Sequence, residues 1–288
     1  MNNVLPFNII ICGCTINSES SIVNSINKLL ELKKYFNSVD ILIYENDSHD
    51  NTPQILKKMR DDQKIKLISE TGIKNKLLSR TMIIAHGRNQ LVNTVVKLDK
   101  YDYMVMIDYD LLSDFDVNTI LTAFQYDNES WDVLTGNCLK KYYDIWALRI
   151  NKDAYSTLHK KIWNNRYIDY DCWDMIAHNR QMGYYNIPLL KRLHIKAFQT
   201  NIPKTYPLIP VESAFNGIGI YKVSKIKNCK YVGFRQQCSC KKYNIIGKCA
   251  FEKCEHVSFH KDIITKNNGR IFICPSLLVP DQKEHWVK

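Results

Sequence analysis

The chain has 288 residues, of which 45% are hydrophobic and 24% are charged. This is an ordinary globular composition, so it excludes a disordered chain and allows one large α/β domain or two small ones. The net charge of +11 favours anionic partners such as phosphates or nucleotides, but the basic residues form no arm with interleaved aromatic residues, which argues against a nucleic-acid-binding protein.

The first half of the chain alternates between strand and helix patterns. Short apolar runs rich in β-branched residues predict strands, and longer amphipathic runs with capping residues predict helices. In chain order we expect strands over 7–13, 39–45, 64–69 and 101–107, with helices over 18–36, 53–61 and 81–98 between them. This alternation predicts a mostly parallel sheet with functional groups at the carboxyl ends of its strands.

The second half is less regular. We expect strands over 131–137, 144–150 and 270–279, a turn and strand over 212–223, and a short helix over 262–268, with a stretch rich in Trp and Tyr up to about residue 185. No linker rich in Pro, Gly or Ser divides the chain. We therefore expect one catalytic domain, 1–288, with a nucleotide-binding half over 1–115 and a sugar and acceptor half over 116–288.

Two acidic residues end the predicted strand over 101–107. In "YMVMIDYD", Asp108 and Asp110 would share one face of the strand and repel each other unless a cation or water reaches both. Taken alone, an Asp-x-Asp is most simply a solvated junction between strand and loop. The second predicted strand, over 39–45, also leads into acids, Glu45 and Asp47, in the crevice where open α/β sheets hold nucleotides.

Two arginines belong to the helix before these acids. Arg80 and Arg88 are two helical turns apart, so they can share one face and contact a diphosphate. The alternative is a solvated helix face. Acids and arginines around one crevice predict a divalent cation, Mn²⁺ or Mg²⁺, that bridges protein carboxylates to phosphates.

Six of the ten cysteines lie in the last quarter of the chain, near His256 and His260. They lack the paired C-x2-C spacing of a zinc knuckle. A structural zinc site, one or two disulfides and reduced thiols packed as small apolar groups all remain open for this set, which is Cys229, Cys238, Cys240, Cys249, Cys254 and Cys274.

Several short blocks follow one another in a specific order: "IYENDSHDNT" over 43–52, a helix with Arg80, Ala85, Arg88, Asn89 and Leu91, "YDIWALR" over 143–149, "VESAFNG" over 211–217, Cys254-Glu255, and "ICP" over 273–275. In this order the chain resembles glycosyltransferases of the GT-A fold. It is most similar to the fungal capsule-associated α-mannosyltransferases and their relatives in large DNA viruses and protists. The likeness covers about residues 5–280, with a poorly matched stretch over 151–210.

The resemblance implies an α/β fold of GT-A type (Rossmann-like): a mixed, mostly parallel central sheet with flanking helices and an irregular C-terminal acceptor region. It also implies a metal-dependent enzyme that transfers a sugar, mannose or another hexose, from a GDP- or UDP-sugar to a glycan or protein acceptor. The fungal relatives suggest retention of anomeric configuration. An inverting enzyme would need a carboxylate base, with Glu212 the first candidate and Asp144 the second.

The resemblance also implies roles for individual residues. The nucleotide and its diphosphate would be contacted by Thr15, Glu45, Asp47, Arg80, Arg88, Asn89, Asp108 and Tyr109. Asp108 and Asp110 would hold the metal with His256 as third ligand, or His260 in its place. The sugar and acceptor would be surrounded by Asp144, Trp146, Glu212, Asn216 and Gly217.

Two other functions fit part of the pattern. A catalytically inactive GT-A module would bind only a glycan or a partner protein. A nucleotidyltransferase would also use this fold and a divalent metal held by carboxylates. Its first strand is normally followed by a basic, glycine-rich loop, whereas "CGCTINSES" at this place has one glycine and no basic residue.

The expected location is the cytoplasm. No stretch approaches the ~18 apolar residues of a membrane-spanning helix, and "FNIIICG" lacks a basic leader. The sequon Asn46-Asp47-Ser48 falls in the expected substrate pocket, where glycosylation would block binding. For a viral protein this would be the host cytoplasm; the sequence makes no prediction of oligomeric state.

Overall fold

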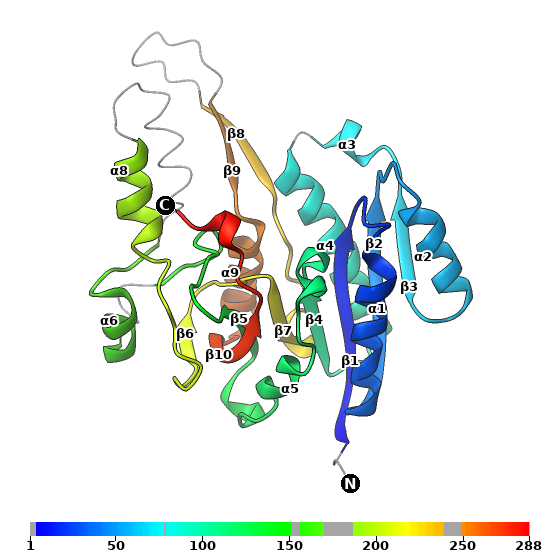
Figure 1. Ribbon diagram of the computed structural model, residues 1–288, viewed down its shortest axis with the longest axis horizontal. Coiled ribbons are helices and arrows are strands. Elements are labelled where there is room, and N and C mark those ends of the chain that lie inside the picture. Colours follow the sequence, from blue (N-terminus) through cyan, green and yellow to red (C-terminus); the bar gives the residue numbers. More distant parts are fainter. Residues whose placement is uncertain (1–3, 78, 151–155, 170–186, 239–248, 288) are drawn as a thin grey trace.

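The computed structural model describes residues 4–77, 79–150, 156–169, 187–238 and 249–287. Within them, eight strands form one mixed sheet in the order β3-β2-β1-β4-β7-β5-β10-β6, and two more form the hairpin β8-β9. Helices flank the large sheet (Figure 1). The expected α/β class with a mostly parallel central sheet is confirmed.

The strands are β1 (Leu5–Thr15), β2 (Phe36–Asn46), β3 (Lys66–Glu70), β4 (Tyr103–Ile107), β5 (Val133–Cys138), β6 (Ile209–Val211), β7 (Ile218–Lys222), β8 (Phe234–Cys238), β9 (Cys249–Lys253) and β10 (Ile271–Val279). The helices are α1 (Ile22–Leu30), α2 (Thr52–Asp61), α3 (Ile73–Lys76), α4 (Arg80–Leu98), α5 (Thr119–Ala123), α6 (Thr157–Trp163), α8 (Ile187–Lys191) and α9 (Glu255–Asn267).

The strand order creates a crevice between β1 and β4. Strands β3, β2, β1 and β4 are parallel, so their carboxyl ends lie at one edge of the sheet. From β1 the chain continues to β2 and β3 on one side and then returns to β4 on the other. Such a reversal leaves an open crevice at the carboxyl ends, which is the usual ligand site of open α/β sheets.

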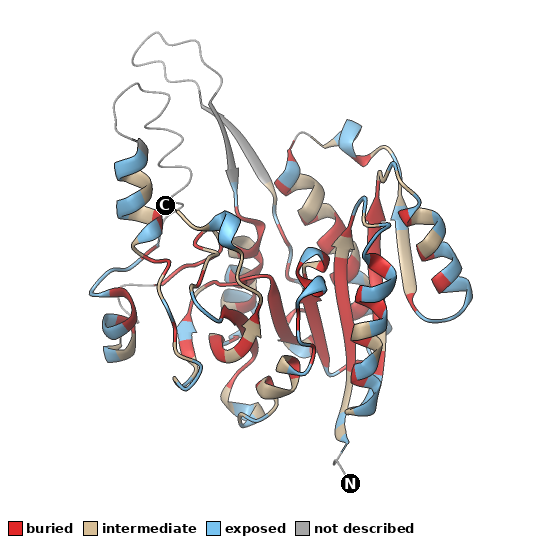
Figure 2. Cartoon of the chain, viewed as in Figure 1, coloured by how far each residue is buried: buried red, intermediate tan, exposed pale blue. Residues whose placement is uncertain are grey.

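Alternating side chains of each strand feed two separate core layers. In β1, Ile9 and Ile11 pack with α1, α2 and α5, whereas Ile10 and Cys12 pack with α4 and α9 on the opposite face. Both faces of the sheet are therefore buried, as the continuous apolar runs of its strands require. Figure 2 shows the buried central strands between helices whose outer faces are exposed.

Three expected elements differ from the observed ones. The helix expected over 18–36 is shorter, because α1 passes into a 3₁₀ turn (Glu31–Lys34) and Phe36 already begins β2. The strand expected over 144–150 is irregular and forms only isolated bridges from Arg149 and Ile150. The helix expected over 262–268 begins at Glu255, because its buried stripe starts with polar residues that the apolar pattern does not register.

The state of the C-terminal cysteines can be described only for some of them. Cys240 lies outside them, as does most of the stretch rich in Trp and Tyr. Among the described side chains, Cys229, Cys254 and Cys274 are buried free thiols. For these three the interpretation as reduced, packed thiols is confirmed.

Candidate active site

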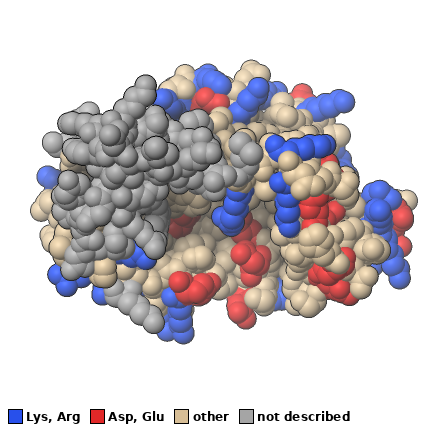
Figure 3. Space-filling view, turned by 90° about the horizontal axis from the view of Figure 1, so that it is seen from above, with Lys and Arg blue, Asp and Glu red and all other residues tan. Residues whose placement is uncertain are grey.

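A cleft of about 1580 Å³ lies over the carboxyl ends of β1, β2 and β4. Its walls come from the start of α4, the turn after β4, the segment after β5, the first residues of α9 and the C-terminal residues 282–287. Seen from above, acidic side chains gather along a hollow that has basic side chains on its rim (Figure 3). Segments from both halves of the chain thus build one site.

The ends of β1 and β2, where nucleotide contacts were predicted, form one side of the cleft. Thr15 lines it, and its hydroxyl is 2.7 Å from that of Ser18. Glu45, predicted here, is not among the lining residues. It is 1% exposed, and its carboxylate accepts hydrogen bonds from Ser48 N (3.1 Å) and Ser69 Oγ (2.6 Å). Glu45 therefore holds the ends of β2 and β3 together, and its neighbour Asn46 faces the cleft instead.

Asp47 and Asn89, which were also predicted to contact the nucleotide, form hydrogen bonds that hold loops in place. Asp47 accepts hydrogen bonds from the backbone N–H groups of Gly72 (2.5 Å) and Lys74 (2.9 Å), which orders the segment that leads to α4. Asn89 forms two hydrogen bonds with the backbone of Tyr231, at 2.7 and 2.8 Å. Neither side chain lines the cleft.

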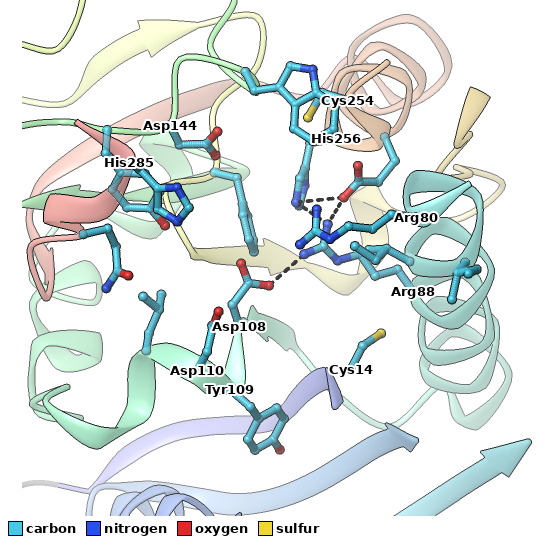
Figure 4. A pocket seen from close by; sticks show the side chains of 18 of the residues that line it. Cys14, Arg80, Arg88, Asp108, Tyr109, Asp110, Asp144, Cys254, His256 and His285 are labelled. Atoms are coloured by element: carbon cyan, nitrogen blue, oxygen red, sulfur yellow. Dashed lines mark hydrogen bonds and ion pairs between the residues drawn. The ribbon is translucent and has the colours of Figure 1, made fainter. Parts of the chain in front are cut away.

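Asp108 and Asp110 both line the cleft, although they do not share a strand face. Strand β4 ends at Ile107, and the chain then enters the 3₁₀ turn η2 (Tyr109–Ser113), in which Leu111 N donates to Asp108 O. Asp110 is exposed, and Tyr109 between the two acids is buried and points away from them (Figure 4). The predicted pairing of the carboxylates is thus produced by a turn at the end of the strand.

Arg88 is enclosed by partners from the end of β4 and from α9. Its Nη2 donates to Asp108 Oδ1 (2.8 Å), and its Nη1 donates to Glu255 Oε1 and to His256 Nε2 (2.6 Å). Both arginines line the cleft, but the side chain of Arg88 is only 7% exposed, whereas Arg80 at the start of α4 is exposed. Of the two, Arg88 is the one that the buried carboxylates hold in place.

Carboxylates concentrate around Asp108. Burial raises the pKa of Asp108 above its usual range; Arg88 opposes this rise, and the nearby Asp110, Glu255 and Asp144 add to it. The side chain keeps 40% exposure toward the cleft, which moderates the shift. A cation delivered into the cleft would relieve this repulsion between carboxylates.

His256 is not positioned as a metal ligand. Arginine has only donors, so His256 Nε2 must accept the hydrogen bond from Arg88, and its Nδ1 carries the proton and is buried without a partner. Burial and the charge of Arg88 hold the pKa of His256 well below its ordinary value. Its ring stacks on Phe215 at 3.8 Å between centroids. The predicted third-ligand role has no geometric support here.

The donor set fits a cation that shares its ligands with a phosphate. Across the part of the chain that the structure describes, no three His, Cys, Asp or Glu side chains gather closely enough to hold a metal ion by themselves. Asp108 and Asp110 provide two carboxylates at the cleft surface. Mg²⁺ is typically bound by one or two carboxylates together with substrate phosphates, so these residues fit such an ion in the presence of a diphosphate.

The alternative ligand, His260, is part of the core. It is fully buried, its Nδ1 lies 2.9 Å from Ser213 Oγ, and its Nε2 lies 3.0 Å from Tyr221 OH. Burial, with a contribution from Arg88, lowers the pKa of His260 to about 3. Because α9 is a helix, His260 is one turn beyond His256 and faces the sheet.

This burial predicts a loss of stability in acid. His260 stays neutral in the folded protein but binds a proton on unfolding below about pH 6.5, so stability is full above that pH and falls as pH decreases toward 3. We expect the free energy of unfolding, measured by urea titration, to decrease as the pH is lowered below about 6.5. The decrease per pH unit should be about 1.4 kcal/mol larger in the wild type than in His260→Gln. The exposed His49→Gln is the control; equal slopes in all three proteins would contradict this prediction.

Asp144 and Trp146, which were predicted to surround the sugar and acceptor, line the cleft. The two oxygens of Asp144 accept hydrogen bonds from Asn216 N (3.0 Å) and Ala147 N (3.2 Å). Burial raises the pKa of Asp144, and these two hydrogen bonds oppose the rise. Asp144 and His285 lie across the cavity from Arg80 and Arg88 (Figure 4).

The other residues predicted on this side support the loop and do not line the cleft. Asn216 is fully buried, and its Oδ1 accepts from the backbone N–H groups of Tyr143 (3.3 Å) and Asp144 (3.4 Å). Gly217 follows with φ of +83°. Glu212 lies near the edge strand β6, where its backbone N–H donates to Arg149 O.

Sequence reasoning missed the C-terminal segment. His285 lines the cleft and stacks on Tyr143 with ring centroids 5.4 Å apart, and Trp286 lines the cleft beside it. Gln199 holds this segment, since its amide donates to His285 O (2.9 Å) and accepts from Val287 N (2.8 Å). Gln199 lies in the poorly matched stretch, so no motif signalled this contact.

No family model and no curated protein matches the chain. Three similar solved structures are M. tuberculosis glucosyl-3-phosphoglycerate synthase with UDP (10% identity, 95% of this chain and 69% of that one, TM-score 0.39), the same enzyme with Mn²⁺, UDP-glucose and phosphoglyceric acid (10%, 95% and 69%, 0.38), and S. aureus TarS 1-349 with UDP-GlcNAc (15%, 96% and 59%, 0.45). The chain thus spans less than two thirds of TarS 1-349. These identities and TM-scores are too low to transfer a function.

Within the described residues, none of the helices combines the length and the apolar character needed to cross a bilayer.

Proposed function

We propose that this chain is a metal-dependent glycosyltransferase that uses a nucleotide sugar. The observation that carries this proposal is the pair Asp108 and Asp110 at the carboxyl end of β4, in a large cleft beside the β1–β4 crossover and with exposed Arg80 on its wall. Acids that can share a cation with a diphosphate, at the ligand end of an open α/β sheet, suit the binding of a nucleoside diphosphate sugar.

The lining residues support one orientation of the donor. Thr15 and Asn46 would contact the nucleoside, and Arg80 would contact the diphosphate. Asp108 and Asp110 would hold Mn²⁺ or Mg²⁺, which when bound supplies neutralisation of the charge on the departing nucleoside diphosphate. The sugar, mannose or another hexose, would then lie toward Asp144.

The two candidate bases differ in access to the cleft. Glu212 does not line it, whereas Asp144 does. Both oxygens of Asp144 already accept backbone hydrogen bonds, which weakens it as a proton acceptor. This favours Asp144 as a residue that orients the sugar or acceptor, and it agrees with retention of configuration, in which the donor phosphate assists the acceptor hydroxyl.

The acceptor would enter from the side lined by Trp146, Trp286 and His285. Aromatic rings offer apolar faces for a sugar, which supports a glycan or glycoprotein acceptor. We also propose a cytoplasmic site of action, because Asn46 of the sequon is 6% exposed and lines the cleft, where an attached glycan would obstruct the donor. The fungal α-mannosyltransferase likeness remains part of this proposal.

The test is a panel of GDP- and UDP-sugars, each incubated with the protein and Mn²⁺ or Mg²⁺ without acceptor. We expect slow release of one nucleoside diphosphate, lost with a chelator and restored by Mn²⁺, because water can replace the acceptor. The nucleotide that responds identifies the donor. A protein that only binds glycans would release none, and a nucleotidyltransferase would instead release pyrophosphate from a nucleoside triphosphate; either result would overturn the proposal.

A further inference from the structure

The Cys254-Glu255 block begins α9 beside the cleft, and Glu255 has no role in the proposed chemistry. Glu255 is 5% exposed, and its carboxylate accepts a hydrogen bond from Arg88, 167 residues earlier in the chain. The same guanidinium holds Asp108 through its other terminal nitrogen (Figure 4). One cation therefore connects the first turn of α9 to the end of β4.

Aromatic rings confine this guanidinium. Its central carbon lies 4.9 Å from the centroid of Phe215 and 5.7 Å from that of Tyr231. His256, which accepts from Nη1, stacks on Phe215 in turn. With rings and hydrogen-bond acceptors around it, Arg88 has a single well-defined position.

The charges favour that position. Burial opposes the positive charge of Arg88, but Glu255 and Asp108 outweigh it and raise the pKa of Arg88, so the group stays protonated. If Arg88 moved to a bound diphosphate, Glu255 would remain as a buried carboxylate without its cation. Leaving one charge of a buried pair unpaired is strongly unfavourable.

We propose that Arg88 and Glu255 are positioning residues that form a clamp on Asp108. Glu255 keeps Arg88 in place, and Arg88 holds Oδ1 of Asp108, which leaves the other carboxylate oxygen for the cation that arrives with the donor. The diphosphate is contacted by Arg80 and not by Arg88. This inference rests on the proposed function and adds to it how the metal-binding acid is oriented.

Calorimetry with nucleoside diphosphates, with and without Mn²⁺, tests the clamp. Glu255→Gln preserves the shape of the side chain but removes its charge, so Arg88 would compete with the metal for Asp108; Arg88→Lys keeps a charge but loses the two-pronged geometry. In both variants we expect the tightening of nucleotide binding by Mn²⁺ to fall at least about tenfold, with metal-free affinity unchanged. Arg80→Gln should weaken metal-free binding.

Asp132→Asn is the matched control. Asp132 is also a buried carboxylate paired with an arginine, Arg270. It directly precedes β5, at the end of the strands that lies away from the cleft. It should lower the melting temperature without changing the effect of Mn²⁺, which separates stability from positioning.

The other possible results of the calorimetry refute either the clamp or the proposed function. If Glu255→Gln tightens metal-free binding and Arg88→Lys weakens it, Arg88 contacts the diphosphate and the clamp is wrong. Wild-type dependence on Mn²⁺ in both variants would also refute the clamp while leaving the proposed function intact. If the wild type itself shows no binding that depends on Mn²⁺ with any nucleoside diphosphate, the proposed function fails and the clamp falls with it.

Discussion

Replacing Asp110 with alanine is expected to lower Mn²⁺-dependent release of nucleoside diphosphate by about 100-fold or more, the scale seen when one group that stabilises developing charge is removed. Asp110 is exposed in the cleft, whereas Leu111 and Leu112 make the core contacts of the same turn. The variant should therefore fold normally. Initial rates with the responsive nucleotide sugar measure the loss, and circular dichroism melting checks the fold.

Asp114→Ala is the control for Asp110→Ala. Asp114 is exposed and follows the same 3₁₀ turn, but it is not among the residues that line the cleft. It should retain wild-type activity. If Asp110→Ala turned over at the wild-type rate, or if a chelator had no effect on the wild type, Asp110 would be a solvated residue at a strand end and the metal proposal would fail.

Gly217→Ala is expected to lower the free energy of unfolding by about 2–4 kcal/mol, the combined scale of backbone strain and overpacking. Gly217 has φ of +83°, and a Cβ atom there would lie 2.0 Å from Leu111 Cδ1. Its carbonyl accepts from Asp108 N at 2.9 Å. The added methyl group would displace the turn that carries Asp110, so urea titrations should show lower stability and rate assays lower activity.

Gly72→Ala separates strain from packing. Gly72 has a similar φ of +74°, but no heavy atom lies within 4 Å of the position of its Cβ. This variant should lose only about 1 kcal/mol, from the backbone conformation alone. Equal losses in the two variants would mean that Leu111 moves aside at little cost and that the turn after β4 is not tightly packed.

The strands of the first half could be predicted because their burial on both faces produces continuous apolar runs. The run over 9–12 in β1 and the whole of β4 are buried between α1 on one face and α4 on the other, so every position in these runs is apolar. Helix α9 was predicted only in its last turns, because Glu255, His256 and His260 occupy its buried face. Periodicity identifies buried positions only when they are apolar.

The end of β2 shows the limit of pattern reasoning about a site. The sequence places Glu45 near the crevice, and it is near, but Asn46 and not Glu45 lines the cleft. Side chains alternate along a strand, so a shift of one residue exchanges the faces. Which alternate set faces the ligand depends on how the neighbouring strands and loops are arranged.

The alternation of strands and helices, and with it a mostly parallel sheet whose carboxyl edge carries the two acids Asp108 and Asp110, could be predicted from the sequence alone. Local propensity and apolar periodicity suffice for these features, because they depend on residues close together in the chain. The partners of buried groups depend on the three-dimensional packing: Arg88, predicted to contact a diphosphate, pairs with Glu255, 167 residues away. A charge pattern predicts that a buried group needs a partner, but the packing of α9 against α4 selects which one.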